Sequence, residues 1–174
     1  MILKIYTLIH VVISLAGIFS GFIVLYGLLT NRRLDRWTAF FLATTIATSV
    51  TGFFFPVHRF MPSHAVGILS LLVLAVAIYA RYPRHLAGGW RKAYVLTALV
   101  ALYFNVFVAI VQSFSKVPAL RDLAPTQSEP PFKLTQLVVL ILFAAVTILS
   151  AIRFRAEPVP TTPITSPTTE SMTV

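Results

Sequence analysis

The side chains best suited to chemistry in this sequence are its histidines, above all His10, His58 and His64. Neutral imidazole is a common ligand of transition metals, and two histidines on facing helices can hold haem. His10 and His64 form the best pair, with His58 or Glu129 as a candidate further ligand for a metal. Their spacing matches no metal or haem motif, so a haem- or metal-binding redox protein is an alternative hypothesis and not the leading one.

Other reactive side chains give weaker signals. The chain has no cysteine, which excludes disulfides, thiolate metal sites and cysteine nucleophiles. Neither Asp35 nor Asp122 belongs to a Ser-His-Asp pattern, because no nucleophile motif accompanies them. We therefore expect a protein without enzymatic chemistry of its own.

The composition indicates which environment must position these residues. Hydrophobic residues make up 57% of the chain and charged residues only 11%, against about 25% in soluble domains. A soluble fold of 174 residues would leave too much apolar surface in water. The net charge of +9 comes from short basic runs beside apolar segments. This pattern indicates membrane topology and contact with a lipid bilayer, not nucleic acid.

Five apolar stretches have about the length that a membrane-spanning helix needs. Unpaired backbone amides are too costly in lipid, and the stretches lack the alternation of a β-barrel, so helices are predicted. We expect an all-α bundle of five transmembrane helices within residues 1–155. The shortest stretch ends near Arg81, whose side chain is expected to reach out to the interface. The predicted spans are residues 5–29, 37–55, 64–82, 93–114 and 134–152.

The basic residues in the loops predict the orientation, because the more basic side of a membrane protein stays in the cytoplasm. With the N-terminus outside and the C-terminus inside, nine basic residues face the cytoplasm and five face outward. The cytoplasmic ones are Arg32, Arg33, Arg36, Arg81, Arg84, Arg91, Lys92, Arg153 and Arg155. The outer ones are Lys4, Arg59, Lys116, Arg121 and Lys133.

This orientation gathers most polar side chains on the outer face, while His85 lies on the cytoplasmic side. We call the outer group the polar rim: His10, His58, His64, Asn105, Gln112, Gln127, Glu129 and Gln136. Polar residues within spans are functional candidates, although Asn105 could simply bond a neighbouring helix. The leading hypothesis is a non-enzymatic bundle that binds a ligand or partner through this rim. A third hypothesis is a small channel or carrier that works as an oligomer.

The longest outer loop, residues 115–133, has strong local signals. Pro118 is placed to begin a short helix that runs to Ala124. Pro125, Pro130 and Pro131 are expected to stiffen the remainder into an extended path. Such a loop could be a lid that carries Gln127 and Glu129 inward, or a rigid connector that lies on the headgroups.

Small residues recur at four-residue spacing in the first two predicted spans, at Gly17 and Gly21 and at Ala43 and Ala47. Such pairs let helices approach closely, either within one bundle or across a homo-oligomer or other membrane partner. We favour packing within the bundle, because the pattern is frequent in membrane helices. Residues 156–174 are rich in Pro, Thr and Ser, which predicts a disordered cytoplasmic tail.

Four segments together resemble uncharacterised small multi-pass inner-membrane proteins of bacteria. They are residues 51–56 (TGFFFP), 62–67 (PSHAVG), 101–107 (ALYFNVF) and 124–132 (APTQSEPPF). The resemblance covers roughly residues 1–155. It implies a location in the bacterial plasma membrane and brings no activity or site residue with it.

Overall fold

A computed structural model describes residues 2–55 and 62–155 of the chain. Within these residues all regular structure is helical, which confirms the all-α prediction. The predicted tail, residues 156–174, lies outside the described residues, as do His58 and Arg59. The helices are α1 (Ile2–Leu29), α2 (Asp35–Gly52), α3 (Pro62–Arg81), α4 (Trp90–Lys116), α5 (Pro118–Leu123) and α6 (Pro130–Arg153).

Four of these helices, α1, α3, α4 and α6, are long and apolar enough to cross a membrane, as in a multi-pass membrane protein. The exception among the long helices is α2, which begins with Asp35 and Arg36 and carries many hydroxyl side chains. The second predicted span therefore forms a helix, but its composition alone does not qualify it as a crossing.

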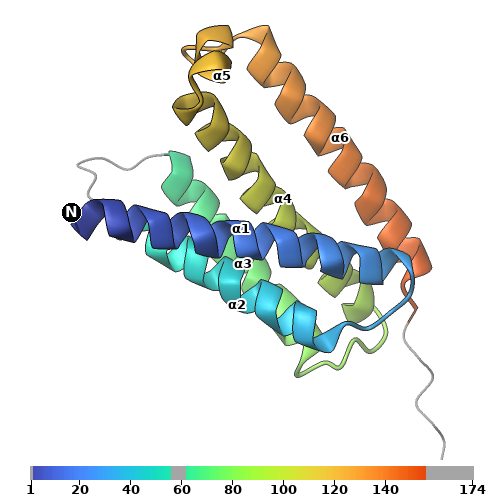
Figure 1. Ribbon diagram of the computed structural model, residues 1–174. Helices are drawn as coiled ribbons and strands as arrows, with labels where there is room; N and C mark the ends of the chain where they lie inside the picture. The colour runs from blue at the N-terminus through green and yellow to red at the C-terminus, as the bar shows by residue number, and fades with distance from the viewer. Residues whose placement is uncertain (1, 56–61, 156–174) are drawn as a thin grey trace, which may run out of the picture.

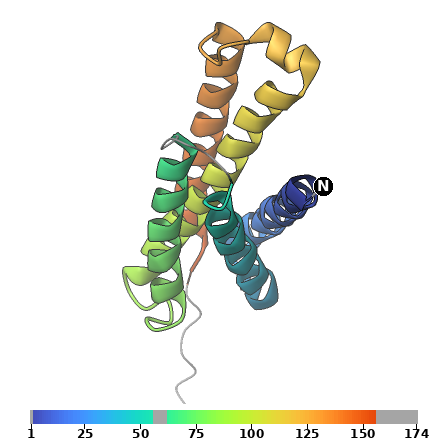
Figure 2. The ribbon, with the colours of Figure 1, turned by 90° about the vertical axis from the view of Figure 1, so that its left-hand side faces the viewer.

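The long helices alternate in direction, so their ends form two groups. We call one the basic end, because the nine basic residues assigned above to the cytoplasmic side lie at or beside it. The other, which we call the rim end, holds the start of α1, the end of α2, the start of α3, and the α4–α5–α6 connection. Figure 1 shows α1 and α6 close together at the basic end and far apart at the rim end, whereas Figure 2 shows α2 and α3 closest near the rim end, where Ser49 contacts Ser70.

The buried core lies toward the basic end, in agreement with this shape. Most of its members come from the second halves of α1 and α3 and from the first halves of α2 and α4. Leu86 from the α3–α4 loop, Phe143 from α6 and Phe154 after α6 complete it. In α6, only Phe143 and Ser150 are buried. The half of α6 near the rim end has no buried residue and is mostly exposed, as expected for a helix with one face toward lipid or another membrane helix.

The loop between α4 and α6 differs in part from its prediction. The short helix exists: α5 begins at Pro118 and ends at Leu123, with its first turn set by the proline. The prediction of an extended path through Pro130 and Pro131 is wrong, because both prolines begin α6. The missing N–H of proline costs nothing in the first helical turn, where amides have no intrahelical partner.

Candidate functional site

His10 takes part in a polar cluster between α1 and α2 at the rim end. Its Nδ1 lies 2.8 Å from the hydroxyl of Thr51. The Tyr6 hydroxyl, one turn earlier on α1, donates to the main-chain carbonyl of Thr51 at 2.5 Å. The His10 ring also packs edge-on against Phe55, with 5.1 Å between ring centroids. These contacts attach α1 to the end of α2 and fix the plane of the imidazole.

The same hydrogen bonds assign the tautomer of His10. The single hydroxyl proton of Thr51 is used in a 2.6 Å hydrogen bond to the carbonyl of Ala47. The Thr51 oxygen must then accept a proton from His10, so Nδ1 carries the proton of the neutral ring. The lone pair of Nε2 is left as the acceptor, and this is the arrangement found in histidines that ligate a metal.

The other proposed ligands do not join this cluster within the described residues. The ring of His64, at the start of α3, stacks on Phe53 with 5.7 Å between centroids. His58 lies outside the described residues. Across residues 2–55 and 62–155, no three His, Asp or Glu side chains gather as a metal site would require.

Asn105 lies in a second polar cluster, deeper in the bundle. Its amide nitrogen donates to the hydroxyl of Thr45 at 3.0 Å, and the Asn105 side chain is buried. A Cβ added to Gly17 would lie 3.5 Å from that nitrogen and 3.3 Å from the Thr44 hydroxyl. The absence of a side chain at Gly17 therefore lets α1 cover the Asn105–Thr45 hydrogen bond between α2 and α4, which is a structural use of the asparagine.

The glutamines of the polar rim have separate surroundings. Gln127 donates to the Val111 carbonyl at 3.1 Å and to the Ser115 hydroxyl at 2.6 Å, which fastens the loop to the end of α4. Gln136 donates to the carbonyl of Phe107 at 3.3 Å, while Gln112 is exposed. These contacts favour the rigid connector over a lid that carries Gln127 inward.

The Glu129 side chain stabilises the loop that leads into α6. Its carboxylate accepts hydrogen bonds from the hydroxyl and amide of Thr126, at 2.9 and 3.2 Å, and from the amide of Ser128 at 3.0 Å. Partial desolvation raises the pKa of the Glu129 carboxyl, but these hydrogen bonds outweigh it and hold the pKa below its usual range. Glu129 is therefore ionised at neutral pH and closes the turn before α6.

The small residues of α1 lie at contacts within the chain. A Cβ on Gly21 would come 2.4 Å from Leu102 Cδ1 of α4 and 3.0 Å from Phe41 Cε2 of α2. Ala43 is exposed and Ala47 is half-buried. The Gly17–Gly21 face of α1 thus packs against α2 and α4.

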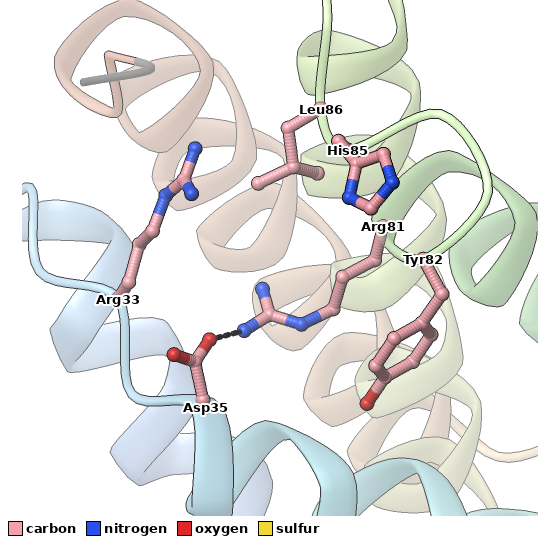
Figure 3. A pocket seen from close by; sticks show the side chains of 6 residues that line it. All are labelled: Arg33, Asp35, Arg81, Tyr82, His85 and Leu86. Atoms are coloured by element: carbon pink, nitrogen blue, oxygen red, sulfur yellow. Dashed lines mark hydrogen bonds and ion pairs between the residues drawn. The ribbon is translucent and has the colours of Figure 1, made fainter. Parts of the chain in front are cut away.

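The basic end holds a feature that the polar-rim hypothesis did not anticipate, a hollow of about 170 Å³. Figure 3 shows Arg81 reaching from the end of α3 to Asp35 at the start of α2, with which it forms an ion pair. The Arg81 side chain is 7% exposed and that of Asp35 is 78% exposed. The expectation that Arg81 reaches out to the interface is wrong, because Asp35 and the ring of Tyr94 draw it inward. The residues that line the hollow are Arg33, Asp35, Arg81, Tyr82, His85 and Leu86.

The sequence contains a signal for this pair. Asp35 is the only acidic residue before Asp122, and it lies at the end where nine basic residues gather. A lone carboxylate at the end where the cations gather favours an ion pair, but the sequence does not single out Arg81 as its partner.

Comparison of the chain with protein-family models, with curated proteins and with solved structures gives no match.

Proposed function

We propose that the chain is a five-span protein of the bacterial plasma membrane, with its N-terminus outside and its C-terminus in the cytoplasm. The packing of α2 supports a fifth crossing. After Asp35 and Arg36 it has no charged residue, and four of its hydroxyl groups form hydrogen bonds within the protein. Thr44 and Thr51 bond back to carbonyls of their own helix, while Thr45 and Ser49 bond Asn105 and Ser70 on neighbouring helices.

Within this topology, the proposed role is non-enzymatic binding of a ligand or partner at the rim end. The observation that carries the proposal is the His10 cluster. Most other members of the polar rim are used in bonds within the chain, whereas the tautomer of His10 leaves the Nε2 lone pair as an acceptor.

The second candidate, a haem- or metal-binding redox protein, is favoured by the same tautomer. In a histidine that ligates a metal, the N–H of the second ring nitrogen usually donates a hydrogen bond to an oxygen, as Nδ1 of His10 does to Thr51. His64 would be the partner ligand. The two candidates differ in whether the bound species contains a metal.

One experiment separates them: native mass spectrometry of the protein purified in mild detergent, with an absorbance spectrum and metal analysis of the same sample. A colourless, metal-free adduct that is lost in His10→Ala supports the first candidate. A Soret band or stoichiometric metal that is lost in His10→Ala supports the second and ends the first. Thr30→Ala, an exposed position at the opposite end of α1 and outside the polar rim, is the control and should retain the adduct. A protein without adduct, colour or metal would contradict both.

A further inference from the structure

The hollow at the basic end has an excess of positive charge. Its lining holds two guanidinium groups, Arg33 and Arg81, and one carboxylate, Asp35, which pairs with Arg81 (Figure 3). The imidazole of His85 lies beside Arg81. Arg33, Arg81 and Asp35 together give the lining a net charge of about +1. A volume of about 170 Å³ exceeds the roughly 30 Å³ that one water molecule takes up in the liquid, so the hollow can hold a small polyatomic anion.

Contacts within the protein fix the orientation of the Arg81 guanidinium and leave it donors for a further acceptor. Its guanidinium lies 5.2 Å from the centre of the Tyr94 ring and 6.0 Å from that of Tyr82, and Asp35 accepts from its Nη2. Cation–π contacts and an ion pair fix the plane of the guanidinium before any ligand arrives. A guanidinium has five N–H donors, so one oxygen of Asp35 leaves donors for a second acceptor.

The loop that follows α3 is built to close one side of the hollow. His85 and Leu86 have φ angles of 48° and 60°, a left-handed conformation that is unfavourable for side chains of this size. Burial of Leu86 and a 3.0 Å hydrogen bond from its amide to the carbonyl of Ala80 hold this conformation. Consecutive residues in a sparsely populated conformation are more common at functional sites than elsewhere. Here they place His85 on the wall of the hollow.

We propose that this hollow binds the phosphate group of an anionic ligand between Arg33 and Arg81. Arginine matches phosphate oxygens with paired N–H donors, and such charge-assisted bonds are roughly twice as strong as neutral ones. Two sources can supply the group: the headgroup of an anionic phospholipid, which lies at the level of the basic end of a membrane bundle, or a soluble phosphate compound. The site goes beyond the proposed role of the rim end and does not depend on His10.

The test uses the full chain in uncharged detergent and follows its thermal unfolding midpoint during titration. The three probes are short-chain phosphatidylglycerol, short-chain phosphatidylcholine as the zwitterionic control, and inorganic phosphate. The matched variants are Arg33→Gln, which removes a cation from the hollow, and Arg32→Gln, which removes its exposed neighbour outside the lining. Neither replaces the buried Arg81, so both are expected to fold.

We expect phosphatidylglycerol to raise the midpoint, and Arg33→Gln to increase its half-saturating concentration about tenfold, as for loss of one hydrogen bond to a charged group. Arg32→Gln should change it by less than about twofold. A response to inorganic phosphate would assign the site to soluble phosphates, and a response to phosphatidylglycerol alone would assign it to lipid. Equal losses in the two variants, an equal effect of phosphatidylcholine, or no response to any probe would overturn the proposal. Each result is independent of whether an adduct is found at His10.

Discussion

The pairing of Asp35 with Arg81 joins residues of very different exposure. Water still reaches the carboxylate, whereas the guanidinium lies against Tyr94 and is almost fully covered. Removal of either partner therefore has unequal consequences. Without Asp35, a buried cation loses its counter-ion; without Arg81, an exposed anion is simply solvated.

A double-mutant cycle tests this asymmetry. We expect Asp35→Asn to lower the free energy of unfolding by about 1–3 kcal/mol, because it leaves the Arg81 charge buried without its carboxylate. In an Arg81→Met background the same change should cost little, since no buried cation remains. Unfolding in mixed detergent micelles measures both. An equal cost in the two backgrounds would show that the ion pair is not coupled to burial.

Glu129 gives the chain a pH-dependent feature outside the helices. Its pKa is lowered in the folded protein, so the ionised carboxylate stabilises the turn at neutral pH, above the unfolded value of about 4.3. That stabilisation is lost as the pH falls through the lowered pKa. Hydrogen exchange of the amides of Thr126 and Ser128, corrected for intrinsic rates, should accelerate in that acid range. Glu129→Gln should remove the pH dependence, and an unchanged profile in this variant would refute the assignment.

At the scale of the elements, α1 is held against α2 and α4 through its glycines. The two positions have different amounts of free space, since a Cβ at Gly21 meets Leu102 and Phe41 while one at Gly17 meets only the polar groups of α2 and α4. Leu102 and Phe41 are themselves fully buried, so they have little room to move.

We predict that Gly21→Ala lowers the free energy of unfolding by about 1–3 kcal/mol, the usual cost of overpacking a core. Gly17→Ala is the matched control, because it makes the same chemical change on the same helix face and its nearest contact is 3.3 Å away. It should cost less. Unfolding in detergent gives the stability, and size-exclusion chromatography gives the oligomeric state, which neither change should alter. A Gly21→Ala protein of normal stability but altered oligomeric state would instead place the seam between two copies.

The helices were largely predictable and the contacts between them were not. Long apolar runs and Pro118 before a short apolar stretch indicate where helices form, because these signals are local. The start of α6 was misplaced because proline has two opposite meanings, breaking a helix interior or beginning a helix.

The candidate sites depended on information of longer range. Orientation placed His10 and Thr51 at the same end, but their hydrogen bond joins residues 41 positions apart and needs the register of α1 against α2. The ion pair of Asp35 with Arg81 spans 46 positions in the same way. The clustering of polar residues on one side also overestimated how many side chains of the polar rim are available to a ligand. Asn105, Gln127 and Gln136 each form a hydrogen bond within the chain.

At the scale of the whole molecule, the charges and the buried core both lie toward the basic end. The ends of α1 and α6 converge where the basic residues gather, and the two helices separate toward the end where the polar cluster of His10 lies (Figure 1). In the proposed topology the converging end faces the cytoplasm, where anionic lipid attracts it, and the spread end faces outward. The proposed role of each candidate site depends on this arrangement, because it decides which side of the membrane the site faces.

The proposed topology depends on α2, because its crossing of the membrane makes the number of spans five and sets the two ends on opposite sides. The chain has no cysteine, so single cysteines introduced into it report only their own position. In intact bacterial cells, a membrane-impermeant maleimide should label Phe54→Cys and Ser128→Cys, while Thr30→Cys and Ala87→Cys should react only after permeabilisation. Labelling of Phe54→Cys and Thr30→Cys from the same side would contradict the five-span topology, because α2 would then not cross the membrane.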